Sequence, residues 1–110
     1  MKLINATKRK TLTINLKETT SFWDKIFGLI DKRNPRALLF KTRFGLHTFF
    51  LTTPIDLLVL DKKFRVVKIE SHFSAYRFFF YNPIYQLVIE LPAGTLKKTQ
   101  TTINDKILFE

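Results

Sequence analysis

Residues 54–70 read PIDLLVLDKKFRVVKIE and predict a β-hairpin. Residues 55–60 are apolar except for Asp56, and residues 65–70 are rich in Val and Ile. The polar residues Asp61, Lys62 and Lys63 between the two runs predict a tight turn. Because a buried carboxylate needs hydrogen-bond donors, Asp56 marks a position where the fold has to supply them.

The rest of the chain also has the pattern of short strands. Ser21 and Asp24 form a helix-capping signature, so we expect a helix over residues 21–31. Many short strands and one early helix predict a mainly β fold, a compact barrel or sandwich of about seven short strands with one short N-terminal helix. The other segments expected to form strands are residues 11–16, 37–40, 46–51, 84–91 and 103–109, the last of these after a turn.

Composition indicates a single domain over residues 1–110. A hydrophobic fraction of 45% with 12 Phe is enough for a packed core. Cysteine is absent, which excludes disulfides, iron–sulfur clusters, Cys-ligated zinc and a thiol nucleophile. No segment has the pattern of a signal peptide or a transmembrane helix. We expect a cytoplasmic protein as sequenced, or an extracytoplasmic one if a leader or anchor was removed.

The net charge of +10 is concentrated in two stretches. Residues 1–17 and 32–55 carry Lys and Arg but no Asp or Glu. A basic surface of this kind predicts weak binding to polyanions at low salt, even where it is only a solvated face.

Seven blocks occur in the order and spacing of the domain-of-unknown-function 192 family. They are FWDKIFGL (22–29), LLF (38–40), HTFF (47–50), PID (54–56), LD (60–61), RVV (65–67) and IELPAG (89–94). The chain resembles this family over residues 18–109. The resemblance implies a compact β-rich domain of small prokaryotic proteins, often exported or lipid-anchored, with no accepted catalytic residue, cofactor or substrate.

Three positions depart from the family pattern. Leu51 replaces a usual methionine, which a core tolerates. Phe64 replaces a turn glycine, and because a side chain at positive φ costs about 1 kcal/mol, we expect a different turn type. Asn104 also replaces a glycine, and Asn is the next-best residue for the left-handed conformation.

The residues with candidate chemistry are His47, Asp56, Tyr76 and Arg77, which we take as a hypothetical ligand-binding set. His47 and Asp56 can act as a general base or as half of a metal site. In the alternative, Asp56 accepts backbone N–H groups and His47 is a half-buried ring. Glu90 lies on the strand face opposite Ile89 and Leu91, and we expect it to pair with Arg77 or a lysine.

An aromatic run follows at residues 76–81. Strand side chains alternate, so Phe78, Phe79, Phe80 and Tyr81 cannot all point inward. Some of these rings are therefore expected at the surface, where they form a contact surface or, with the basic residues, stack on single-stranded nucleic acid.

We expect an uncharacterised, non-enzymatic binding or accessory module with a cleft for a small ligand or a protein contact, the partner being another protein or a second copy. The alternative is nucleic-acid or polyanion binding through the basic and aromatic surface. A third hypothesis is a hydrolase or metal enzyme that uses His47 and Asp56. No catalytic residue, metal or cofactor is assigned.

Overall fold

The computed structural model describes residues 1–19, 37–43, 45–47, 53–74 and 76–110. The helix expected over residues 21–31 lies outside this described part. The described elements are β1 (Leu3–Asn5), β2 (Lys10–Thr13), β3 (Lys17–Thr19), β4 (Leu38–Lys41), β5 (Leu46–His47), β6 (Ile55–Leu60), β7 (Val66–Phe73), β8 (Phe78–Phe79), β9 (Leu87–Pro92), α2 (Thr95–Lys98) and β10 (Ile107–Phe109). The prediction of a mainly β fold is confirmed.

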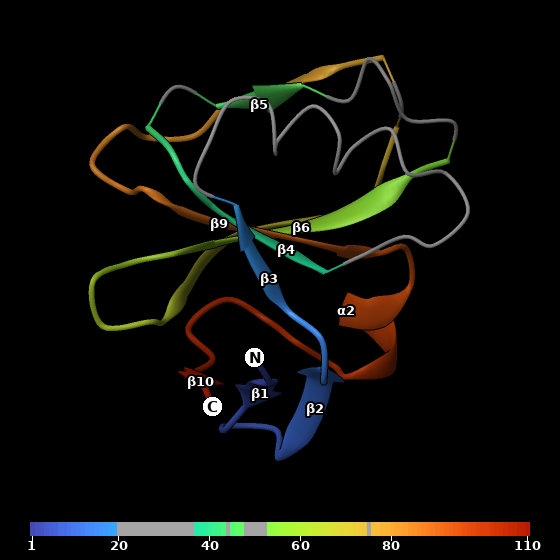
Figure 1. Ribbon diagram of the computed structural model, residues 1–110, viewed down its shortest axis with the longest axis vertical. Coiled ribbons are helices and arrows are strands. Elements are labelled where there is room, and N and C mark those ends of the chain that lie inside the picture. Colours follow the sequence, from blue (N-terminus) through green and yellow to red (C-terminus); the bar gives the residue numbers. More distant parts are fainter. Residues whose placement is uncertain (20–36, 44, 48–52, 75) are drawn as a thin grey trace.

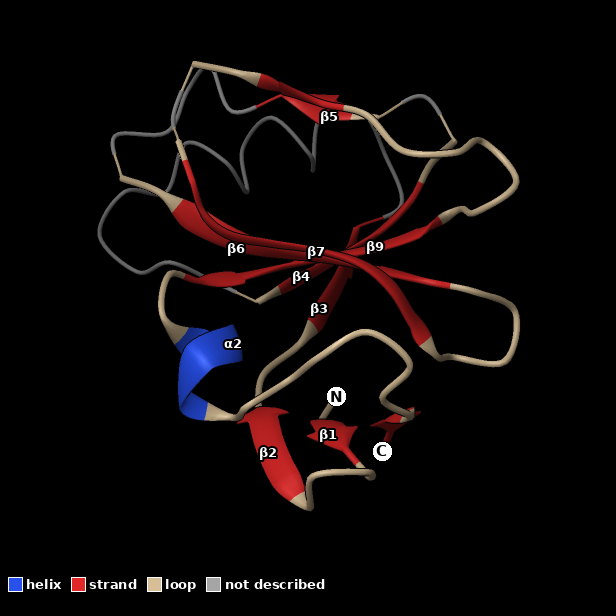
Figure 2. Ribbon diagram, turned by 180° about the vertical axis from the view of Figure 1, so that it is seen from behind, coloured by secondary structure: helices blue, strands red, loops and turns tan. Residues whose placement is uncertain are grey.

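The strands form three layers (Figure 1). A five-stranded central sheet has the order β3-β4-β9-β6-β7, and it is antiparallel except for the parallel pair β3–β4. Below it in Figure 1 lie the small sheet, β10-β1-β2, and the helix α2. Above it lies a two-stranded ribbon made of β5 and β8. The layers stack without closing, so the barrel among the expected architectures is corrected to layered sheets, which Figure 2 shows from behind.

The central sheet is buried on both faces because a hydrophobic core lies on each side of it. All six residues of β6 are buried, which explains its nearly continuous apolar sequence. Side chains that alternate along the strands divide between the two cores. The lower core, toward the small sheet and α2, includes Leu58, Ile89, Leu96 and Ile107. The upper core, toward the ribbon, is built from Leu38, Phe40, Ile55, Leu57, Val59, Phe73, Phe79 and Val88.

The β6–β7 hairpin occurs where the sequence predicts it, but its turn corrects one expectation. Phe64 does take a left-handed conformation, with φ of 61°. The Asp61 side chain accepts the N–H groups of Lys63 and Arg65 at 2.9 and 3.0 Å, and the Phe64 ring packs on Phe109. These contacts offset the strain at Phe64. Asn104, with φ of 77°, takes the left-handed conformation as predicted.

Several elements are absent from the sequence-based prediction. The strands β1, β3 and β8 have only two or three residues each, which is too short for a periodic pattern. A single helical turn, α2, follows Gly94 where only a turn is expected from the sequence. Within the described residues, no helix is long and apolar enough to cross a membrane.

Candidate functional site

The Asp56 carboxylate accepts hydrogen bonds from the start of α2 and from a bulge of β7. Leu57 pairs with Glu70 and Ile55 with Phe73, so two residues of β7 oppose Asp56. This irregularity leaves the N–H of His72 free to donate to Asp56 Oδ1 at 3.0 Å, while the N–H of Leu96 donates to Oδ2 at 2.8 Å. Asp56 therefore accepts backbone N–H groups, which is the structural alternative expected from the sequence.

The other members of the four-residue ligand set lie around the ribbon. The backbone of His47 pairs with Phe78, and its side chain lies outside the described part. The Arg77 guanidinium lies 4.4 Å from the centre of the Phe73 ring, and Tyr76 is exposed at φ of 60°. That these residues bind a ligand together stays a prediction. Among the described residues, no group of three or more His, Asp or Glu side chains could hold a metal ion.

The aromatic run divides between the surface and the upper core, as the alternation of a strand requires. Phe79 is buried, and the half-buried Tyr81 donates its hydroxyl hydrogen to the carbonyl of Thr42. Burial raises the pKa of Tyr81. Phe78 and Phe80 are 56% and 65% exposed, and their rings stack with centroids 5.7 Å apart.

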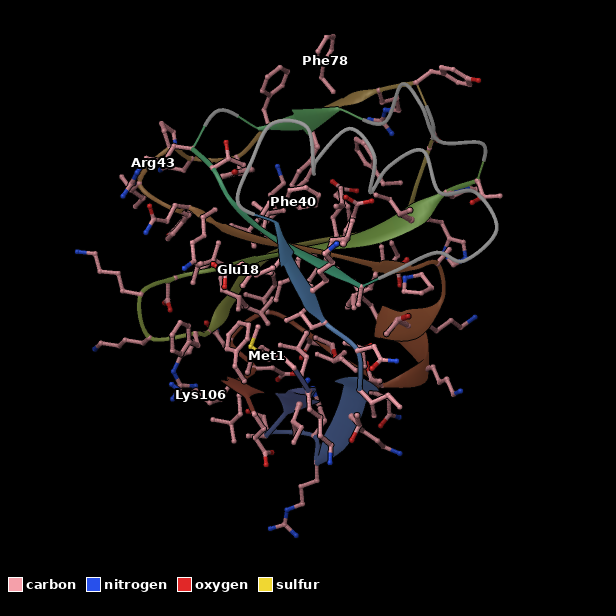
Figure 3. The ribbon with its side chains drawn as sticks, viewed as in Figure 1. Met1, Glu18, Phe40, Arg43, Phe78 and Lys106 are labelled. Carbon is pink, nitrogen blue, oxygen red and sulfur yellow. The ribbon has the colours of Figure 1, made fainter. Side chains whose placement is uncertain are left out.

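We call the exposed rings of Tyr76, Phe78 and Phe80 the aromatic ridge. Figure 3 shows Phe78 pointing away from the molecule above the ribbon. Lys68 Nζ lies 5.0 Å from the centre of the buried Phe79 ring, which is not part of the ridge, and donates to the backbone carbonyl of Phe80 at 2.8 Å. The ridge is therefore an exposed aromatic surface with one lysine hydrogen-bonded to its backbone at Phe80.

Glu90 is a buried acid in the upper core. It pairs in register with Leu38 on β4 and with Leu57 on β6, and both of these residues belong to the upper core. Its side chain therefore lies on the face opposite Ile89, as predicted. The expected partner is not found, because Glu90 Oε2 has no hydrogen-bond partner among the described residues. Burial raises its pKa to about 8.

An open groove with a volume of about 490 Å³ lies between the central sheet and the small sheet. We call it the inter-sheet groove. Its lining is Met1, Glu18, Leu39, Lys41, Phe64, Gln86, Leu87, Leu108 and Phe109. Figure 3 labels two of these residues, Glu18 beside the central sheet and Met1 below it. Phe64 and Leu108 are 38% and 41% exposed, so the groove presents apolar surface to solvent.

Sequence reasoning did not find the inter-sheet groove, because its residues come from six separate parts of the chain. Their proximity depends on how the two sheets stack, which no local pattern shows. One signal was present: in Leu38–Lys41, a lysine follows two residues after an apolar residue on the same strand face. That pattern places a charge at the border of a buried face.

The chain matches the DUF192 family, described as Uncharacterized ACR, over residues 3–109. The chain belongs to the DUF192 family. It is 31% identical to a UPF0127 protein of Thermococcus sibiricus, over 98% of this chain and 74% of that protein. It is 28% identical to the UPF0127 protein PH1112 of Pyrococcus horikoshii, over 96% of each. The resemblance expected from the sequence motifs is thus confirmed.

A solved structure shares the fold of this DUF192 chain. It is a protein of unknown function from Novosphingobium aromaticivorans, with a TM-score of 0.76 and 14% sequence identity. The match covers 98% of this chain and 82% of that protein. At this identity the likeness concerns the fold alone.

Proposed function

We propose that this DUF192 domain is a non-enzymatic binding module that holds a small, mainly apolar ligand in the inter-sheet groove. The observation that carries the proposal is the groove itself, with a volume of about 490 Å³ and six apolar residues among its nine lining residues. Ligand sites in proteins are concave, measure roughly 300–1,000 Å³ and are lined mostly by apolar groups with a few polar ones. The groove has this character.

The exposed apolar side chains of the groove support the same function. Phe64 and Leu108 leave more than a third of their surface in water, and the Phe64 ring packs on Phe109, which lies against the lower core. Covering such surface releases water and is favourable. A ligand that filled the groove would complete the lower core from outside.

The test is titration with N-phenyl-1-naphthylamine, a neutral apolar dye that fluoresces when it leaves water. Leu108→Asn removes apolar surface from the groove, and Ile103→Asn is the matched control, since Ile103 is 48% exposed and does not line the groove. We expect L108N to weaken dye binding about fivefold, in line with the partial loss of one apolar side chain, and I103N to leave it unchanged. The proposal fails if the parent does not bind the dye, or if both variants bind it equally.

Polyanion binding through the aromatic ridge is the second candidate function. The stacked, exposed rings of Phe78 and Phe80 favour it, because single-stranded nucleic acid stacks on such rings. The net charge of +10 predicts binding at low salt in any case. We expect labelled oligothymidine to dissociate at physiological ionic strength. Micromolar binding that survives there and is lost in Phe78→Ala would make this the main function.

The hydrolase or metal-enzyme hypothesis receives the least support from the geometry. Both carboxylate oxygens of Asp56 already accept backbone N–H groups, from His72 and Leu96. A base that takes a proton from a substrate needs a lone pair directed at that substrate. A protein partner or a second copy remains a proposal for the aromatic ridge.

A further inference from the structure

We propose that the ligand of the inter-sheet groove is a single-chain amphipathic anion, a fatty-acid-type carboxylate, whose head group binds Lys41 in place of Glu18. This inference rests on the proposed function, since it names the ligand class of the same groove.

The polar groups of the groove lie together at one end because of strand register. Leu39 and Lys41 share a face of β4, and Leu39 packs in the lower core. Glu18 on β3 pairs in register with Leu39, so its side chain lies on that same face, and its Oε1 is 2.8 Å from Lys41 Nζ. Lys41 pairs with Leu87 on the other side, next to Gln86.

The opposite wall of the groove is apolar. It is formed by Phe64 from the β6–β7 turn, by Leu108 and Phe109 from β10, and by Met1. A site with polar groups at one end and apolar side chains along the rest fits a ligand with one polar head and one apolar body. A ligand that is polar throughout would leave its polar groups unpaired against this wall.

The ion pair between Lys41 and Glu18 is of the kind that a ligand can replace. Their side chains are 55% and 37% exposed. Ion pairs between exposed side chains contribute little to stability, because water solvates both partners well when they separate. A ligand carboxylate can therefore take the place of Glu18 on Lys41 at little cost to the fold.

The charged residues around the groove favour an anionic head group over a cationic one. Among the described residues that line the groove, Glu18 is the only acid, and the chain as a whole carries +10. Beside the apolar wall, Lys106 Nζ lies 5.6 Å from the centre of the Phe64 ring, and Lys62 and Lys63 precede Phe64 in the turn. The field of these cations attracts an anion to the groove and repels a cation.

The experiment measures displacement of bound N-phenyl-1-naphthylamine by three unbranched ligands with the same number of carbon atoms: laurate, dodecanol and dodecylammonium, all below their aggregation concentrations. We expect laurate to displace the dye at a concentration at least about tenfold lower than the other two, as a charge-assisted contact would give. The dye reports on the groove itself, and the difference between the three ligands reports on the head group.

Three variants test the contact with Lys41. Lys41→Gln should bring laurate to within about twofold of dodecanol, both measured by displacement of dye bound to that same variant. Glu18→Gln removes the internal competitor and should strengthen laurate binding. Lys17→Gln is the matched control, because Lys17 is an exposed lysine of β3 that does not line the groove, and it should preserve the laurate preference.

The outcomes separate the inference from the proposed function. If the dye binds but laurate is no better than dodecanol, or if K41Q keeps the laurate preference, the inference is wrong and the proposed function stands. If dodecylammonium is preferred, Glu18 is the anchor and the inference is overturned. If the dye does not bind the parent protein, both are contradicted.

Discussion

Two buried carboxyl groups lie on neighbouring strands, Asp56 on β6 and Glu90 on β9, but their hydrogen-bonding environments differ. Asp56 is fully buried and accepts two backbone N–H groups on the lower side of the central sheet. Glu90 is 4% exposed on the upper side, and its Oε2 has no partner among the described residues. Burial alone therefore does not set the free-energy cost of placing an acid inside the fold. The donors around it do.

Glu90 gives the largest expected effect, a loss of stability as pH rises. Burial raises its pKa from 4.5 to about 8. Between these values the folded protein holds a proton that the unfolded chain has released, so the free energy of unfolding falls as pH rises and levels off above pH 8. The shift corresponds to roughly 4–5 kcal/mol.

Glu90→Gln resembles the protonated acid and has no such titration. We expect E90Q to be more stable than the parent by roughly 3–5 kcal/mol at pH 8 and about equal to it at low pH. Guanidinium unfolding from acid to mildly alkaline pH measures this difference. A parent and a variant with parallel stability curves would show that the Glu90 carboxyl does find donors, and the contrast with Asp56 would disappear.

Asp56 should have the next largest effect, with the opposite sign. Asp56→Ala leaves the N–H groups of Leu96 and His72 without their acceptor, so we expect a loss of about 1–3 kcal/mol. Asp56→Asn keeps one acceptor and should restore part of it. Thermal or chemical unfolding of both variants measures the difference. Variants as stable as the parent would mean that α2 does not depend on this carboxylate.

Asp105 is a second acid on the lower side of the central sheet. It tests whether hydrogen-bond donors stabilise its carboxylate as they stabilise that of Asp56. Burial would raise its pKa, but hydrogen bonds from Asn5, the Thr102 amide and Lys8 lower it from 3.8 to about 2. Its stabilising contribution is therefore present above pH 3.8 and is lost as pH falls toward 2. We expect Asp105→Asn to cost about 1–2 kcal/mol at neutral pH and almost nothing near pH 2. An equal cost at both pH values would contradict this.

The sequence predicts the fold best where the physical signal is local. The apolar run of β6 and its turn are visible because six buried residues and Asp61 are contiguous. Phe64 was misjudged because its compensation comes partly from Phe109, far along the chain. The alternation of the aromatic run correctly predicted that some rings would lie at the surface.

The sequence says less about sites than about strands. Glu90 could be placed on its strand face, but which groups of the described residues lie near its Oε2 depends on what β4 and β6 present beside it. The inter-sheet groove depends on the stacking of two sheets. Strand alternation decides which face a residue lies on, and only the tertiary structure decides what it meets there.

We propose that the ligand binds between the central sheet and the small sheet, and not on the ribbon above. Amide chemical-shift mapping in a laurate titration tests it most directly. We predict that the largest saturable shifts fall at Leu39, Leu87, Leu108 and Phe109, while Phe78 and Phe80 stay unchanged. Saturable shifts confined to Phe78 and Phe80 and their neighbours, with no shift at the groove residues, would place the ligand on the ribbon instead.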